Sequence, residues 1–149
     1  MKFLIQRVED ASVSVENKEI GRIGKGYLVL VGISGTDTKD IADKMIRKLI
    51  GLRIFEDENG KTNLDIKAVN GQMLIISQFT LYADCKKGNR PSFIKAGEPG
   101  MAQELYQYIL DQCRREIAVV EEGSFGAHME VSLVNNGPFT VMLDSNEIF

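Results

Sequence analysis

Three strand-like segments precede the first helical pattern in this sequence, and that order limits the folds available to the chain. "FLIQRV" (Phe3 to Val8) is a short apolar run, and "ASVSVE" alternates small or apolar residues with polar ones. "YLVLVGIS" (Tyr27 to Ser34) is apolar on both faces, which is typical of a central strand. A parallel doubly wound sheet places a helix after nearly every strand, so the order of these segments argues against that fold.

Two later segments have the spacing of amphipathic helices. The inner positions of the first are Ile41, Met45, Leu49 and Leu52, and Thr36 or Asp37 can cap it. The second follows Pro99-Gly100, with inner positions Met101, Leu105, Tyr108, Ile109 and Gln112-Cys113. Another buried strand runs from Gln72 to about Phe79, and the total is six to eight strands. We therefore predict an α+β fold, a mainly antiparallel sheet or β-barrel-like domain with two helices on one side.

Residues 1–149 are expected to form a single domain, because a chain of this length buries about 70% of its unfolded surface. No apolar run approaches the roughly 20 residues of a membrane helix, and the start soon turns polar, unlike a signal peptide. Cys85 and Cys113 have no metal-ligand spacing and give no disulfide framework. We expect a protein of the reducing cytoplasm, with no metal site and no membrane partner.

The segment "VSLVNNGPFTVML" (Val131 to Leu143) reads as a strand interrupted in its middle. Asn136-Gly137 is a strong signal for a two-residue hairpin turn. Pro138 then removes a backbone donor just where the returning strand would begin to pair. The residues alone leave open whether Gly137-Pro138 is only a turn or has a function.

The usual catalytic constellations are missing from the sequence. His128 is the only histidine, and we interpret it as structural or incidental. Polar side chains nevertheless end a core strand at Ser77, Gln78 and Thr80, and burying such groups costs free energy unless they are paired. Either they satisfy neighbouring backbone groups, or the strand end opens at a pocket where backbone N–H groups could hold an oxyanion.

A basic cluster lies in "KKGNRPSFIK", which has no acidic residue. Its members are Lys86, Lys87, Arg90 and Lys95. The net charge of −3 argues against a nucleic-acid partner, yet a local patch can hold an RNA backbone on an otherwise acidic surface. The alternative is a solvated loop without a ligand.

The unusual segments together resemble one known family. "SQFTLYAD", followed closely by "KKGNRPSF", and the later "VSLVNNGPFTVML" are similar to signature blocks of the D-aminoacyl-tRNA deacylases. "QRVEDASVSV", "GYLVLVGIS", "GLRIFEDENGKTNLDI" and "GSFGAHMEVSL" also resemble the family in order and spacing. The resemblance covers essentially the whole chain. Asn136 stands where many relatives carry Asp, a change that should preserve the turn.

The resemblance implies a homodimer of β-barrel-like α+β chains, with the active site at the subunit interface. Its catalytic region corresponds to Ser77, Gln78, Phe79 and Thr80. Its Gly-Pro motif corresponds to Gly137-Pro138, with a cis peptide bond that enters the partner's pocket and selects one configuration at the α-carbon. Arg7 would help to fix that motif. The residues expected to contact tRNA are Lys86, Lys87, Arg90, Lys95, Phe125 and Met129.

The implied reaction is hydrolysis of the ester that joins a D-amino acid to the 3′-terminal ribose of tRNA, without a cofactor. Glycine has no Cβ, so mischarged glycyl-tRNA is a second expected substrate, and DNA is not an expected partner. Thr80 invites a nucleophile assignment, but no histidine or lysine base is evident beside it. We favour assistance by the substrate's own 2′-hydroxyl, with backbone N–H groups around Phe79 and Thr80 as the oxyanion hole.

Two other classes of function fit the same residues. A non-catalytic oligomeric module that binds metabolites or RNA would keep the fold and interface but show no turnover. A threonine-nucleophile esterase acting on small D-amino acid esters would turn over without tRNA.

Overall fold

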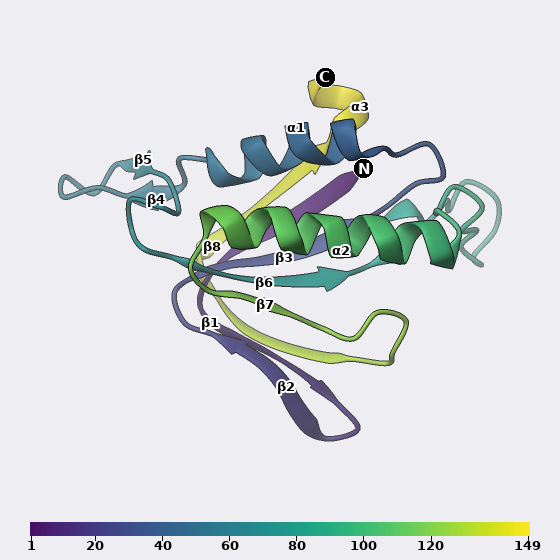
Figure 1. Cartoon of the computed structure of the whole chain (residues 1–149), viewed down its shortest axis with the longest axis horizontal. Coiled ribbons are helices and arrows are strands. Elements are labelled where there is room, and N and C mark those ends of the chain that lie inside the picture. The colour runs from purple at the N-terminus through teal and green to yellow at the C-terminus, as the bar shows by residue number, and fades with distance from the viewer.

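The computed structural model describes residues 1–149 as a curled six-stranded sheet with helices on one face (Figure 1). Its larger elements are β1 (Lys2–Val15), β2 (Lys18–Ile23), β3 (Gly26–Gly32), α1 (Lys39–Ile50), β6 (Gln72–Ser77), α2 (Pro99–Glu116) and β8 (Glu130–Asp144). Its shorter elements are β4 (Phe55–Glu56), β5 (Thr62–Leu64), the 3-10 turn η1 (Phe79–Tyr82), β7 (Val120–Glu122) and α3 (Ser145–Ile148). No helix is both long and apolar enough to cross a membrane.

The sheet has the order β2-β1-β3-β6-β7, and β8 pairs along the other edge of β1. β1 is antiparallel to β2, β3 and β8, whereas β3, β6 and β7 run parallel to one another. The prediction of a mainly antiparallel sheet therefore needs correction, because the sheet is mixed. The reason is the long connection from β3 to β6, which carries α1 across the sheet and returns the chain in the same direction.

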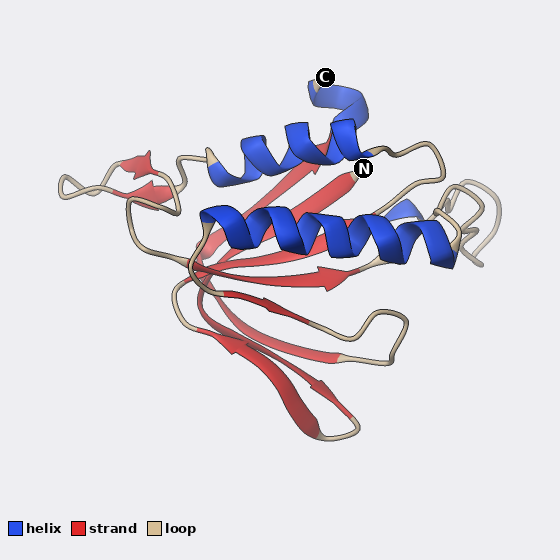
Figure 2. Cartoon of the chain, in the orientation of Figure 1, coloured by secondary structure: helices blue, strands red, loops and turns tan.

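Both predicted long helices are present and cover the same face of the sheet (Figure 2). The prediction of two helices omitted the short α3 at the C-terminus and the 3-10 turn η1. The predicted cap of α1 was also wrong, because Thr38 is the N-cap and its Oγ1 accepts from the Ile41 N–H at 3.3 Å. α2 begins at Pro99 itself. Proline suits this position, because the first residues of a helix have no intrahelical acceptor for an N–H and proline has no N–H.

The central strands β3 and β6 are buried on both faces, as the apolar run of β3 predicted. Val29 and Ile75 point into the large core beneath α1 and α2. Leu28 and Leu74 point into a smaller core enclosed by the curl of β1, β2 and β3. Successive side chains of a strand face opposite sides, so these two strands join the two cores.

The segment containing Gly137-Pro138 is not a hairpin. β8 continues past it and pairs with β1 on both sides, with Asn135 opposite Val8 and Thr140 opposite Gln6. The register shifts between these pairs, so the residues between Asn135 and Thr140 bulge out of the ladder. The Gly137-Pro138 peptide bond in this bulge is cis. We call residues 136–139 the Gly-Pro bulge.

Candidate active site

A cavity of about 620 Å³ opens at the carboxyl end of β6. Its lining is mostly apolar and includes Val31 of β3, Ile33 just after β3, and Ile76 of β6. One wall is formed by residues 93 and 96–99, before and at the start of α2, and the other by residues 125–129 and 131. Ser77, Gln78 and Phe79 lie at its edge. We refer to this space as the β6 cavity.

β6 exposes polar groups at the cavity because its ladder ends earlier than predicted, at Ser77 rather than about Phe79. The Gln78 N–H makes one last bond to the Val31 carbonyl at 2.8 Å, and the chain then enters η1. The side-chain amide of Gln78 donates to the Thr80 hydroxyl. These two polar side chains therefore satisfy each other, while the strand end also opens at a pocket. The strand end therefore lies at a pocket, whereas the Gln78 and Thr80 side chains bond each other and not the neighbouring backbone groups that the first interpretation expected.

The structure separates the four predicted catalytic residues. Ser77, Gln78 and Phe79 line the β6 cavity, but Thr80 is not part of its lining. Phe79 is 58% exposed, and its ring makes an edge contact with Phe93, with centroids 5.1 Å apart. An exposed aromatic pair at a cavity mouth offers a flat apolar surface to a ligand.

Phe125 and Met129, which the family resemblance marked as tRNA contacts, lie on the second wall of the cavity. His128 lies between them on the same wall and is exposed. The interpretation of His128 as structural or incidental did not anticipate a place in the cavity lining. Its place between Phe125 and Met129 in the sequence was the only available signal.

The predicted basic cluster lies in the loop that leads from η1 to this cavity. Lys86, Lys87, Arg90 and Lys95 are all exposed, and none belongs to any of the chain's ion pairs. Asp84 and Ser92 close the loop with two backbone hydrogen bonds of 2.8 and 2.9 Å. The loop thus carries these positive charges between η1 and the cavity residue Phe93 and just beyond it, and none of them has an acidic partner in an ion pair.

The Gly-Pro bulge is organised by Arg7, which is only 7% exposed. Arg7 Nε donates to the Asn136 carbonyl at 3.1 Å, and Nη1 donates to the Ile54 carbonyl at 2.7 Å. The guanidinium also lies 4.9 Å from the centre of the Phe139 ring. Gly137 has a φ of +126°, and a Cβ there would lie 3.0 Å from Arg7 Nη2. Gly137 and Pro138 themselves are exposed.

One chain does not bring the bulge and the β6 cavity together. Arg7 lies opposite Tyr27, which pairs with Met73 at the start of β6. Ser77 pairs with Val31, four residues further along the same strands, or about 13 Å at about 3.3 Å per residue. Neither Gly137 nor Pro138 lines the cavity of its own chain.

The buried titratable groups near the cavity stay neutral at physiological pH. Burial raises the pKa of Tyr82, in η1, to about 12. Burial also raises the pKa of Tyr106, whose hydroxyl donates to the Ile75 carbonyl at 2.7 Å behind the cavity. Because their pKa values are raised, these tyrosines are poorly suited to act as bases.

No three His, Cys, Asp or Glu side chains lie close enough together to hold a metal ion.

Comparison with known proteins places this arrangement in a family. A family model described as D-Tyr-tRNA(Tyr) deacylase matches residues 4–144. D-aminoacyl-tRNA deacylases of Thermosipho africanus and Clostridium novyi are 50% and 53% identical over 149 residues, which is 100% of each chain. A solved structure titled "c-Myc DNA Unwinding Element Binding Protein" has a TM-score of 0.92 at 40% identity, covering 97% of this chain and 98% of that one.

These matches confirm the resemblance inferred from the signature blocks. They extend from the first strand to the last, so both the β6 cavity and the Gly-Pro bulge fall inside the matched region. The chain therefore belongs to the D-Tyr-tRNA(Tyr) deacylase family.

Proposed function

We propose that this chain hydrolyses the ester bond between a D-amino acid and the 3′-terminal ribose of tRNA, and so removes D-residues before translation uses them. The observation that carries the proposal is the full-length identity of about half to relatives named D-aminoacyl-tRNA deacylase. The β6 cavity supplies a site of suitable size, since ligand pockets commonly have volumes of about 300–1,000 Å³.

The chemistry is assigned to the substrate's 2′-hydroxyl and to backbone donors. The Thr80 hydroxyl is already bonded to Gln78 and lies outside the cavity lining, which disfavours it as a nucleophile. The first N–H groups of a helical turn have no intrahelical acceptor, so those of Phe79 and Thr80 are the proposed donors to the carbonyl oxygen. A vicinal 2′-hydroxyl then assists the attack of water on the ester.

Chiral selection is assigned to the Gly-Pro bulge of a second copy of the chain. The bulge is exposed, held by Arg7, and about 13 Å along the strands from its own cavity, which supports its action in the cavity of a partner. A backbone wall excludes an L side chain without regard to its identity. Glycyl-tRNA, which has no side chain, is then a second substrate. The working unit is a homodimer.

The acceptor end of tRNA is assigned to the rim of the cavity. The cations of the basic cluster have no acidic partners, which suits contacts with phosphate rather than with base edges. Phe125 and Met129 on the second wall offer apolar contacts to the terminal nucleoside. The reducing cytoplasm, where charged tRNA is used, suits a chain whose two cysteines are both free.

The test is release of amino acid from matched D-, L- and glycyl-tRNA, beside a binding measurement with tRNA and with a DNA oligonucleotide. We expect rapid hydrolysis of the D-ester, some of the glycyl ester and almost none of the L-ester. Binding of nucleic acid without turnover would favour a non-catalytic module, a function suggested by the name of the DNA-element-binding neighbour. Equal turnover of a minimal aminoacyl-adenosine would favour a general D-amino acid esterase.

A further inference from the structure

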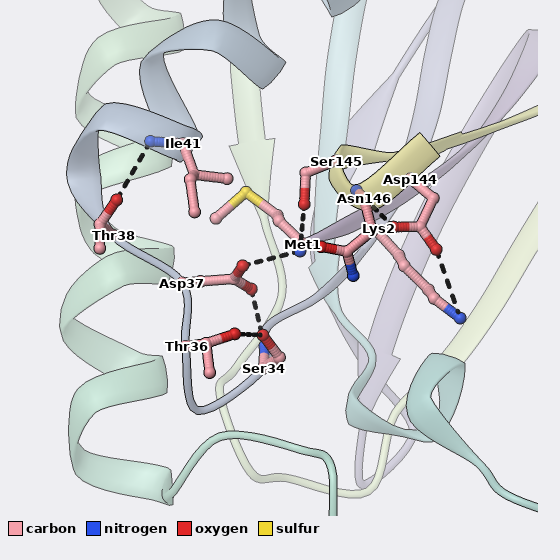
Figure 3. Close-up of polar contacts among 10 residues, drawn as sticks. All are labelled: Met1, Lys2, Ser34, Thr36, Asp37, Thr38, Ile41, Asp144, Ser145 and Asn146. Carbon is pink, nitrogen blue, oxygen red and sulfur yellow. Dashed lines mark hydrogen bonds and ion pairs between the residues drawn. The ribbon is translucent and has the colours of Figure 1, made fainter. Parts of the chain in front are cut away.

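The α-ammonium group of Met1 is buried in a polar cluster that connects three parts of the fold (Figure 3). It donates to Asp37 Oδ1 at 2.7 Å and to Ser145 Oγ at 2.8 Å. The side chains of Met1 and Asp37 are 0% and 2% exposed. The Met1 carbonyl in turn accepts from the Ser145 N–H at 2.9 Å. The cluster joins the start of β1, the turn before α1 and the start of α3.

The charge on this amine matters because neither ion of the pair reaches solvent. A buried charge is tolerated only when it is paired and hydrogen-bonded, and removing one partner leaves the other charge buried and unpaired. An acyl group on the Met1 nitrogen would remove the positive charge and insert atoms between Met1, Asp37 and Ser145. A peptide extension would have the same two effects.

Asp37 lies between Met1 and the segment that leads to the β6 cavity. Its Oδ2 accepts from the Ser34 N–H at 2.7 Å, while its own N–H donates to the Ser34 carbonyl at 3.2 Å. Ser34 forms an antiparallel bridge with Ala96, and the Gly97 N–H donates to the Ile33 carbonyl at 2.8 Å. Ile33, Ala96 and Gly97 all line the β6 cavity. Hydrogen bonds, together with the Ile33-Ser34 peptide bond, therefore connect the Met1 amine to one cavity wall.

This wall is closely packed at Gly97, so a shift of the Ser34 turn should displace it. A Cβ built on Gly97 would lie 2.8 Å from the Met101 sulfur and 3.2 Å from the Ser34 carbonyl oxygen. Asp37 is also not merely the cap of α1, because Thr38 fills that role. Both Asp37 oxygens are directed away from the helix, toward Met1 and Ser34 (Figure 3).

We propose that the free α-ammonium of Met1 is a positioning group for the β6 cavity. Through Asp37 it fixes the Ser34 turn, and through that turn it fixes the wall at Ala96 and Gly97. An acyl group or a peptide extension on that nitrogen should then loosen the wall. Hydrolysis of the amide bond consumes water, releases the attached group as its acid and frees the amine, and it is the class of reaction that would restore the wall.

The experiment compares one protein before and after cleavage of an N-terminal extension by a protease that cuts directly before Met1. Amide hydrogen exchange of each form is followed by NMR. In the extended form, exchange should be at least about tenfold faster at the Ser34 and Gly97 amides, and cleavage should restore the slow rate. Two amides outside the cluster are references: Met73, which donates to Val119, and Asp57, which donates to Lys61. Their exchange should stay unchanged.

Two outcomes would overturn the proposal. The first is unchanged exchange at Ser34 and Gly97 in the extended form. The second is equal acceleration at all four amides, because that would show a general loss of stability and no effect specific to the wall.

An Asp37→Asn variant tests whether the charge pair carries the effect. With the carboxylate gone, the extension should change exchange at Gly97 by less than about threefold, since the two changes act on one contact. An undiminished effect in Asp37→Asn would refute the role of the pair. If that variant does not fold, Ser145→Ala removes only one acceptor, and exchange at Ser34 should then rise by about threefold with Met73 unchanged. No change at Ser34 would again count against the proposal.

A second readout rests on the proposed function. The extended form should have a raised KM for D-aminoacyl-tRNA and a nearly unchanged kcat, at a temperature where both forms are folded. Hydrogen exchange needs no substrate, so failure of the proposed function and failure of the positioning role would be told apart.

Discussion

The β6 cavity and the Gly-Pro bulge are the two unusual regions of this chain, and they differ in almost every physical respect. The cavity is concave, mostly apolar and built from four separate segments of the sequence. The bulge is convex, exposed and built from one segment, with Arg7 as its main support. The cavity is thus a largely apolar hollow, whereas Gly137 and Pro138 form an exposed projection that Arg7 supports from within the same chain.

Under the proposed function, this difference would let a chain with one histidine provide a stereoselective site. A cavity that accepts many side chains cannot also reject by fit, because its volume must suit the largest ligand. Under the proposal, selection falls to a separate element, the Gly-Pro bulge, which lies about 13 Å along the strands from the cavity of the same chain. The two regions would then have to meet between two copies of the chain.

The largest expected effect comes from disabling the cavity in one chain and the bulge in another, and then combining the two chains in one dimer. Ser77→Phe fills the cavity, and Gly137→Ala adds a Cβ 3.0 Å from Arg7 Nη2 at a φ of +126°. Each variant alone should lose at least about a hundredfold in deacylation. A mixture of dimers assembled at random from both chains should recover about a quarter of wild-type activity, because half of the dimers hold one intact site.

The measurement is deacylation of D-aminoacyl-tRNA by the random mixture and by mixed dimers purified through different tags on the two chains. The purified mixed dimers should recover about half of wild-type activity, because one of their two sites is intact. Thermal melts of each variant check that the fold is retained. Absence of any recovery in tagged mixed dimers would show that the cavity and bulge do not act across subunits. A fully active monomer would show the same.

The second prediction concerns the chemistry in the cavity. Replacing the terminal 2′-hydroxyl of the substrate by hydrogen should lower kcat by at least about a hundredfold, since general acid–base assistance typically contributes that much. Thr80→Ala should stay within about tenfold of wild type, because the Thr80 hydroxyl is bonded to Gln78 and outside the cavity lining. A dead but folded Thr80→Ala protein, together with an acyl-enzyme detected by mass spectrometry, would instead establish a covalent threonine.

The third prediction concerns the support of the bulge. Arg7→Lys keeps the positive charge but cannot bond the Asn136 and Ile54 carbonyls at once. The free energy of unfolding should fall by about 1–3 kcal/mol, and discrimination between D- and L-aminoacyl-tRNA by about tenfold. Arg22→Lys, at an exposed arginine paired with Glu19, is the matched control and should change stability by less than about 0.5 kcal/mol. Unchanged discrimination in Arg7→Lys would separate Arg7 from selectivity.

The sequence indicated where a cavity could lie better than it indicated which residues line it. The apolar runs of β3 and β6 identified the two central strands, and the polar residues after β6 marked its open end. His128 was not predicted to line the cavity, because which segments meet across a pocket depends on tertiary packing that local patterns do not encode. The parallel pairing of β3 with β6 was missed for the same reason.

The bulge shows the opposite balance. Its residues were evident from the sequence, but Asn136-Gly137-Pro138 suits a hairpin as well as a bulge, and only pairing with β1 on both sides decides between them. The Met1 amine had no sequence signal at all, since every chain has an N-terminal amine and burial alone makes this one significant.

The smallest expected effect lies at the rim of the cavity, in the basic cluster. Lys86→Gln with Lys87→Gln removes two exposed charges that have no acidic partner. KM for D-aminoacyl-tRNA should rise severalfold, and the slope of log affinity against log salt should fall by about 1.4, at about 0.7 per phosphate of single-stranded RNA.

Stereoselectivity should not change in that double variant, because the basic loop and the Gly-Pro bulge have separate tasks. Lys18→Gln with Lys61→Gln is the matched control, since it removes the same net charge from two exposed, unpaired lysines that do not line the cavity. The control should leave the slope near its wild-type value if phosphate contacts are local to the rim. Equal slopes in the two double variants would mean that tRNA responds to net charge alone. The loop at Lys86 and Lys87 would then be an ordinary solvated surface, and the cavity would have to hold its substrate through the acceptor end only.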